Sequence, residues 1–259
     1  MGVTFASTPL PYGVLHLSIL AAIALLVAGL CFLLRKLSEK GLLRLLFILG
    51  CAMIAAEVFK QWFVWKYVYG GALSTWFFPW QLCSMAMYCS AAVFFTKGKA
   101  QDVLLVFLAT FSLVAAVFAL IFPGDMMRPQ ILLFCHSFLY HFVMVIESVI
   151  AMILLARRKK ARFWPAIVLY TAMAAVAQII NIVSHYVIGN NKLASNMFNI
   201  TPFYPSTQPV FHEIALAIGV IPEIFLYLGL IVLASFGVYL LIYLFAGMKR
   251  RKKEKNAAR

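Results

Sequence analysis

Long apolar stretches recur along the whole chain, and their length is the feature that most limits how it can fold. Each covers roughly 20 residues, which is the length an α-helix needs to cross the hydrocarbon core of a bilayer. The last stretch is longer than one crossing needs, so we expect it to begin as an outer-surface segment and to enter the membrane near Pro222. The seven predicted spans are residues 12–34, 42–65, 79–96, 102–122, 131–155, 163–188 and 214–247.

The composition excludes a water-soluble domain. Of the 259 residues 64% are hydrophobic and the mean hydropathy is +0.96, whereas a soluble domain is about 45–50% apolar. The segments between the spans are short, so no separate soluble domain is expected. We therefore predict an all-α fold, a polytopic membrane helix bundle that forms a single transmembrane domain over residues 1–259. Residues 248–259 form a basic tail.

The net charge of +14 is distributed in a way that indicates membrane orientation. Four segments on the same side of the predicted spans hold 18 of the 22 basic residues, namely residues 35–44, 97–99, 157–162 and 249–259. Basic residues concentrate in cytoplasmic segments, so we predict that the N-terminus is outside and the C-terminus is cytoplasmic. The expected partners of this charge are the anionic heads of membrane phospholipids, not nucleic acid.

Polar side chains gather in the outer half of the predicted spans. Buried ionisable groups are costly in a membrane and often mark a functional site, so we interpret this group as a polar cavity open to the outside or to the outer leaflet. The alternative is a structural network that holds helices together. The group comprises His16, Glu57, Lys60, Cys83, His136, His141, Gln178, Asn181, His185, His212, Glu213 and Glu223.

The spacing of these residues refines the prediction. Glu57 and Lys60 are three residues apart and can pair on one helix face. Gln178, Asn181 and His185 also share a face. The loop after them is rich in Asn, Pro and Ser and includes Asn191 and Asn196. It is long enough to cover a cavity as active-site lids do, although an ordinary interfacial loop is the alternative.

Cys83 is the candidate nucleophile. Pro79 suits the first position of a helix, which places Cys83 in the first turns, where the helix dipole favours a thiolate. A buried cysteine that only packs is the alternative. His136 and His141 are five residues apart, about 140° around a helix, so we expect one of them to meet Cys83. Neither the histidine nor the cysteine spacing is typical of a metal site, and no cofactor motif is present.

Several short motifs resemble one known family. These are "PWQLCS" at residues 79–84, the pair His16 and Leu17, "EVFK" at 57–60, "FLYHF" at 138–142 and the Asn-rich loop after residue 188. Over residues 12–240 the chain resembles the YwaF-like integral membrane proteins, bacterial relatives of the eukaryotic transmembrane-protein-164 group. The resemblance implies a bacterial plasma-membrane enzyme that moves fatty acyl chains between phospholipids. It also implies a thioester on Cys83 and help from His141, with His136 as the alternative histidine.

This chemistry is compatible with the residues themselves. A histidine can act as general base toward the thiol and then toward the incoming hydroxyl, and Asn181 or His185 could donate to the oxyanion. Two other functions use the same polar cluster. A transporter or binding protein would depend most on Glu57, Lys60 and Glu147, and a structural membrane protein would need the cluster only for assembly.

Overall fold

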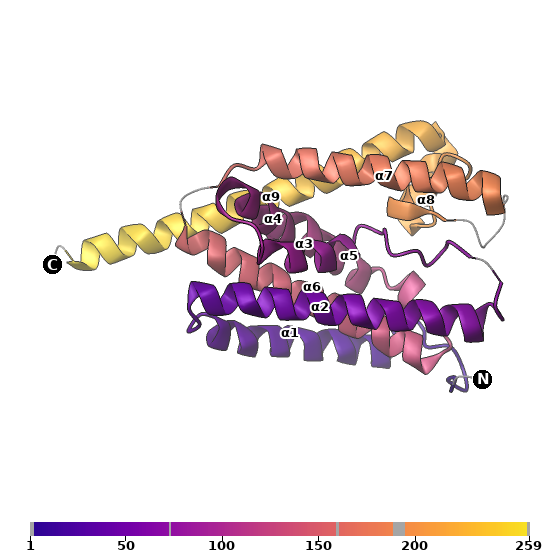
Figure 1. Cartoon of the computed structure of the whole chain (residues 1–259), viewed down its shortest axis with the longest axis horizontal. Helices are drawn as coiled ribbons and strands as arrows, with labels where there is room; N and C mark the ends of the chain where they lie inside the picture. Colours follow the sequence, from indigo (N-terminus) through magenta and orange to yellow (C-terminus); the bar gives the residue numbers. More distant parts are fainter. Residues whose placement is uncertain (1–2, 73, 159–160, 189–194, 258–259) are drawn as a thin grey trace.

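The computed structural model describes residues 3–72, 74–158, 161–188 and 195–257, with side chains placed up to residue 247. These residues form a bundle of helices without strands, apart from one isolated bridge between Thr4 and Gln130 (Figure 1). The long helices are α1 (Val14–Leu34), α2 (Glu39–Phe63), α6 (Ile131–Arg157), α7 (Trp164–Ile188) and α9 (Val220–Ala257), and the short ones are α3 (Met85–Val93), α4 (Gly98–Phe107), α5 (Leu113–Ile121) and α8 (Pro209–Ile218). The predicted all-α fold is confirmed.

Six helices of the described part are long and apolar enough to cross a membrane. A π-helical turn, Val64–Val68, extends α2, and another, Leu108–Ser112, joins α4 to α5 into one continuous helix. The candidate spans are Val14–Leu34, Glu39–Val68, Gly98–Ile121, Ile131–Arg157, Trp164–Ile188 and Val220–Gly247. The chain is therefore an integral membrane protein, as its hydropathy predicts.

The predicted span at residues 79–96 differs in extent. It contains only the nine-residue helix α3, preceded by tight turns in which Ser84 N–H donates to the Gln81 carbonyl. The Tyr88 hydroxyl donates to the Pro79 carbonyl at 3.0 Å. The Gln81 side chain is hydrogen-bonded to the loop after α7. These bonds keep residues 79–84 out of the helix, so Pro79 does not start it.

The break in the last apolar stretch lies at Gly219, as expected near Pro222. Gly219 has φ 93°, in a region that only glycine adopts without strain. It ends α8 and lets α9 begin at Val220 in a new direction. The separate helix α8 precedes the long helix α9, so the last apolar stretch is divided into two helices.

A glycine allows α3 to lie against α2. A Cβ built on Gly50 would be 2.6 Å from the backbone nitrogen of Ala91 and 2.9 Å from the carbonyl oxygen of Met87, so no larger residue fits without moving α3. The two helices run in opposite directions along this contact. Glu57 of α2 therefore reaches the level of the turns that contain Cys83, and both line the same cavity.

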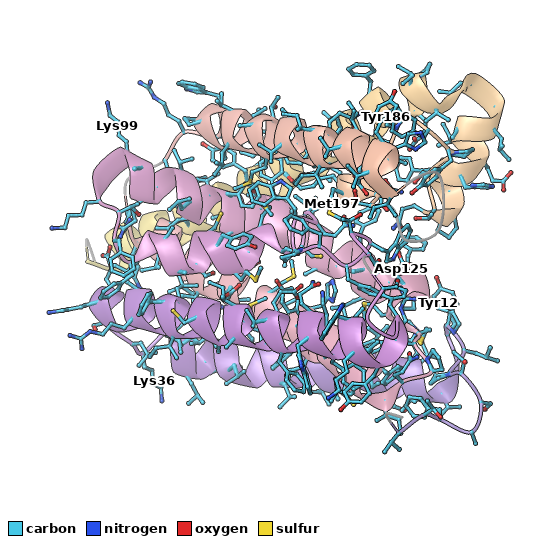
Figure 2. The ribbon with its side chains drawn as sticks, turned by 45° about the vertical axis from the view of Figure 1, so that its right-hand side comes forward. Tyr12, Lys36, Lys99, Asp125, Tyr186 and Met197 are labelled. Carbon is cyan, nitrogen blue, oxygen red and sulfur yellow. The ribbon has the colours of Figure 1, made fainter. Side chains whose placement is uncertain are left out.

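The basic segments meet at one end of the bundle. Arg157 donates to the carbonyls of Leu37 and Arg35 at 2.7 and 2.8 Å, and Arg158 donates to Asp102 at 3.1 Å. Figure 2 shows Lys36 and Lys99 at this end, with Tyr12 and Asp125 at the other.

The N-terminal segment is fixed at that opposite end. It pairs with the start of α6, where Phe5 N–H donates to the Pro129 carbonyl at 2.9 Å and Ile131 N–H donates to the Val3 carbonyl at 3.1 Å. This pairing closes the bundle beside the segment that joins α5 to α6.

Candidate functional site

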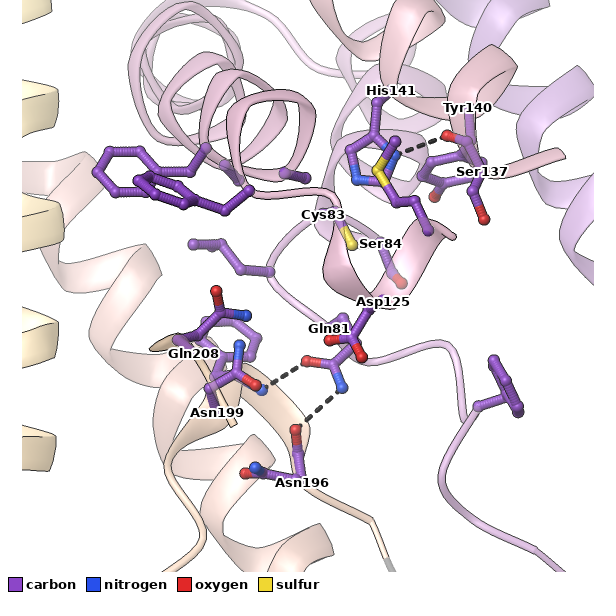
Figure 3. Close-up of a pocket in the computed structure, with 18 of the residues that line it drawn as sticks. Gln81, Cys83, Ser84, Asp125, Ser137, Tyr140, His141, Asn196, Asn199 and Gln208 are labelled. Carbon is purple, nitrogen blue, oxygen red and sulfur yellow. Dashed lines mark hydrogen bonds between the residues drawn. The ribbon is translucent and has the colours of Figure 1, made fainter. Parts of the chain in front are cut away.

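A cavity of about 250 Å³ lies at the end of the bundle that holds the N-terminal segment. Residues of α2, α5, α6 and α9 line it together with the turns before α3 and the loop after α7 (Figure 3). Six of the predicted site residues reach this cavity: Glu57, Lys60, Cys83, His136, His141 and Asn196. Part of the predicted polar cluster therefore lies around one cavity, and the remaining members do not.

Cys83 lies in the turns before α3 and not within the helix. It is partly buried and lines the cavity. Its backbone carbonyl accepts from Ala86 N–H at 3.3 Å, which leads the chain into α3. Within the described ranges its own N–H donates to no backbone carbonyl. The fold therefore leaves this backbone donor next to the thiol.

His141 has a defined tautomer. Its Nδ1 lies 2.7 Å from the Ser137 carbonyl oxygen, and a carbonyl can only accept, so Nδ1 carries a proton. In the neutral imidazole Nε2 then keeps its lone pair. His141 is 8% exposed and faces the cavity. The ring is thus held in the form that can accept a proton through Nε2.

His136 also lines the cavity, although its spacing from His141 predicts different faces. Its Nε2 is buried and has no hydrogen-bond partner in the described part of the chain. No hydrogen bond joins Cys83 to either histidine within that part. Both histidines therefore line the same cavity as the thiol, although they leave α6 in different directions.

The predicted pair of Glu57 and Lys60 is present. Lys60 Nζ lies 2.6 Å from Glu57 Oε1, and Gln61 Nε2 donates to the same oxygen at 2.7 Å. Lys60 also lies 5.6 Å from the centre of the Phe77 ring, and Arg128 lies 5.2 Å from that centre. Arg128 lines the cavity but sits in a connection that the sequence pattern gives no reason to select.

The loop after α7 covers the cavity through a set of amide contacts. Gln81 Oε1 accepts from Phe198 N–H at 2.8 Å, and Gln81 Nε2 donates to the Asn196 carbonyl at 2.9 Å. Phe198 and Asn199 both have left-handed backbones, with φ of 59° and 57°, which for side-chain-bearing residues needs support from neighbours. The wall of Gln81, Asn196, Asn199 and Gln208 is seen in Figure 3.

Asn181 holds this loop in place. Its Oδ1 accepts from Met197 N–H at 2.6 Å and its Nδ2 donates to the Met197 carbonyl at 3.0 Å. Its amide is occupied and does not line the cavity, so it is not placed to bind an oxyanion. His185 stacks on Phe203, with ring centres 3.5 Å apart, away from the cavity.

Other predicted residues also fall outside the cavity wall. Gln178 has a buried Oε1 without a partner in the described part and does not line the cavity. Asn191 lies outside the described residues. Glu147 is fully buried in α6, its carboxyl oxygens have no hydrogen-bond partner within the described ranges, and it too is absent from the lining.

His16 of the sequence motif is a structural residue. Its Nδ1 accepts from Tyr12 N–H at 3.0 Å and its Nε2 lies 2.9 Å from the Leu120 carbonyl oxygen, so both nitrogens are paired. Across the described residues, no three His, Cys, Asp or Glu side chains lie close enough together to hold a metal ion.

The comparisons with known proteins identify a family. Residues 11–241 match the family model of the TMEM164 family. Searches among curated proteins and among solved structures found no match. The matched range contains every residue of the cavity wall and most of the chain. It confirms the resemblance based on the short motifs, and the chain belongs to the TMEM164 family.

Proposed function

We propose that this protein is a cysteine-dependent acyltransferase that moves a fatty acyl chain from one phospholipid to another. The observation that carries the proposal is that Cys83 and His141 line one cavity, with the Nδ1 proton of His141 donated to the Ser137 carbonyl. A nucleophile and a base oriented by a third group are the elements that covalent catalysis requires.

The first half-reaction loads the enzyme. His141 Nε2 takes the proton of the Cys83 thiol as the sulfur attacks the acyl ester carbonyl of the donor lipid. The tetrahedral intermediate then expels the lysophospholipid alkoxide, and His141 returns the proton to that oxygen. The products are a thioester on Cys83 and a free lysophospholipid, with no change of oxidation state.

The second half-reaction transfers the acyl chain from Cys83 to an acceptor lipid. The hydroxyl of an acceptor lysophospholipid attacks the thioester carbonyl, and His141 takes its proton. Collapse of the intermediate expels the Cys83 thiolate, which is reprotonated by His141. The apolar side of the cavity suits a fatty acyl chain, because it includes Phe118, Phe122, Phe211 and Ile231.

The same proposal includes the topology. The basic segments meet at one end of the bundle through Arg157 and Arg158, while the cavity lies at the other end. The chain between Gln81 and Lys97 runs from the cavity end to the basic end and supplies a further crossing through α3. With the basic end in the cytoplasm, the chain crosses seven times, and its N-terminus and cavity face outward. Its resemblance to bacterial proteins favours the bacterial plasma membrane.

The test is capture of the thioester. The purified protein is incubated with a phospholipid that carries an alkyne-tagged acyl chain, and the protein-bound label is measured before and after neutral hydroxylamine, which cleaves thioesters. We expect a hydroxylamine-sensitive label that Cys83→Ala abolishes and His141→Ala strongly reduces.

Two matched controls sharpen this test. Cys135→Ala removes an exposed cysteine of α6, and His185→Ala removes a histidine outside the cavity. Both variants should label like the wild type. A folded wild-type protein that takes up no label would overturn the acyltransferase proposal and favour a binding or transport role for the cavity.

A further inference from the structure

Tyr140 has a hydroxyl that the fold does not use. The residue is only 7% exposed, lies directly before His141 on α6 and lines the cavity. Its hydroxyl oxygen is buried and has no hydrogen-bond partner in the described part of the chain. A buried tyrosine hydroxyl usually finds a partner, and leaving it without one costs free energy. The Tyr140 hydroxyl is therefore a hydrogen-bond donor that a bound ligand can use.

The ring of Tyr140 is held by its neighbours rather than by its hydroxyl. It meets His141 edge-on, with ring centres 5.9 Å apart and planes at 67°, and stacks with His136 at 5.6 Å and 24°. Figure 3 shows Tyr140, His141, Cys83 and Ser84 together on one side of the cavity, away from the amides of Asn196 and Gln208. The ring that carries this donor is therefore held at the wall of the cavity that Cys83 also lines.

Acyl transfer needs such a donor. Attack of a thiol on an ester carbonyl places negative charge on the carbonyl oxygen, and donors fixed around that oxygen lower the barrier. The N–H of Cys83, which donates to no backbone carbonyl in the described part, can supply one hydrogen bond. Asn181 is occupied by Met197, and the free nitrogen of His141 must accept a proton. A second donor is still needed.

We propose that Tyr140 is a further catalytic residue, whose hydroxyl donates a hydrogen bond to the oxyanion of both tetrahedral intermediates. The inference rests on the proposed function and extends it. Tyr140 stays protonated throughout, since it stabilises the charge without transferring a proton.

The experiment compares Tyr140→Phe with the wild type in two measurements. The first is the initial rate of thioester labelling. Loss of one oxyanion donor lowers such rates by on the order of 100-fold to 1000-fold, and we expect a fall in this range. The second is the thermal unfolding midpoint in detergent, which should stay the same or rise, because the lost hydroxyl has no partner and the ring packing remains.

Tyr170→Phe is the matched control. Tyr170 also has a buried hydroxyl without a partner in the described part, and its ring stacks on Phe111 at 4.8 Å, but it does not line the cavity. We expect this variant to label at the wild-type rate.

The outcomes separate the two proposals. A Tyr140→Phe variant that labels as fast as the wild type would overturn the inference and leave the thioester mechanism intact. Lost labelling together with a lower unfolding midpoint would also overturn it, because the hydroxyl would then be holding the fold. A wild-type protein without label would refute the thioester mechanism itself.

Discussion

Removal of the Asn181 side chain should open the loop that covers the cavity. Both Asn181 amide atoms bind the backbone of Met197, at 2.6 and 3.0 Å, and Asn181 is 1% exposed. Asn181→Ala leaves one backbone N–H and one carbonyl without partners in a buried place. Each such group costs about 1–3 kcal/mol, so the closed loop should lose about 2 kcal/mol or more. Since 1.4 kcal/mol is a factor of ten in an equilibrium constant, the closed form should fall roughly 30-fold relative to the open form.

Hydrogen exchange of the backbone amides in residues 195–208 measures this directly. We expect exchange there to rise by about the same factor in Asn181→Ala, while the core of α6 exchanges as in the wild type. Gln178→Ala is the control, because Gln178 Oε1 is buried without a partner in the described residues one turn earlier on α7. Unchanged exchange in Asn181→Ala, or an equal rise in Gln178→Ala, would refute the assignment of Asn181 as the residue that holds the loop.

Three further substitutions test the packing, the ion pair and the topology. Gly50→Ala should lower the thermal unfolding midpoint and slow thioester labelling, because its Cβ would force α3 away from α2; an unchanged midpoint would contradict this contact. Glu57→Gln should lower the free energy of unfolding by about 3–5 kcal/mol, the usual cost of breaking a buried ion pair. Adding Lys60→Met should restore much of that loss. If denaturation shows that the losses of the two single variants simply add in the double variant, the ion pair is refuted. A cysteine placed at Asp125 should react with a membrane-impermeant maleimide in intact cells, whereas one at Lys99 should react only after permeabilisation; the reverse pattern would invert the proposed topology.

Much of the helical architecture was predictable because a bilayer sets the length of a spanning helix. The apolar runs predict the six long candidate spans, and the positive φ of Gly219 explains the expected break near Pro222. The predicted span 79–96 contains a helix that is shorter than expected and covers Met85–Val93. Its apolar composition suits a helix, but hydrogen bonds made by Tyr88 and Gln81 to distant or non-helical groups hold residues 79–84 in turns. Such tertiary contacts leave no periodic signal.

The cavity wall contains some of the polar residues that the sequence selects and leaves out others. Cys83, His141 and Glu57 reach the cavity because polar groups at one depth in a membrane gather where they can be satisfied. His185 shares that depth but turns to Phe203. Tyr140 stands inside the segment "FLYHF", yet tyrosine is common near membrane surfaces. Its unpartnered hydroxyl together with its place in the cavity wall distinguishes it.

The most direct test of the central claim is peptide mass spectrometry of the protein after incubation with donor phospholipid and no acceptor. The account predicts the mass of one acyl chain on the peptide that contains Cys83, and loss of that mass when a lysophospholipid is added. An unmodified Cys83 peptide from folded protein, or an acyl group that stays on Cys83 after the acceptor is added, would contradict a transfer that proceeds through this thiol.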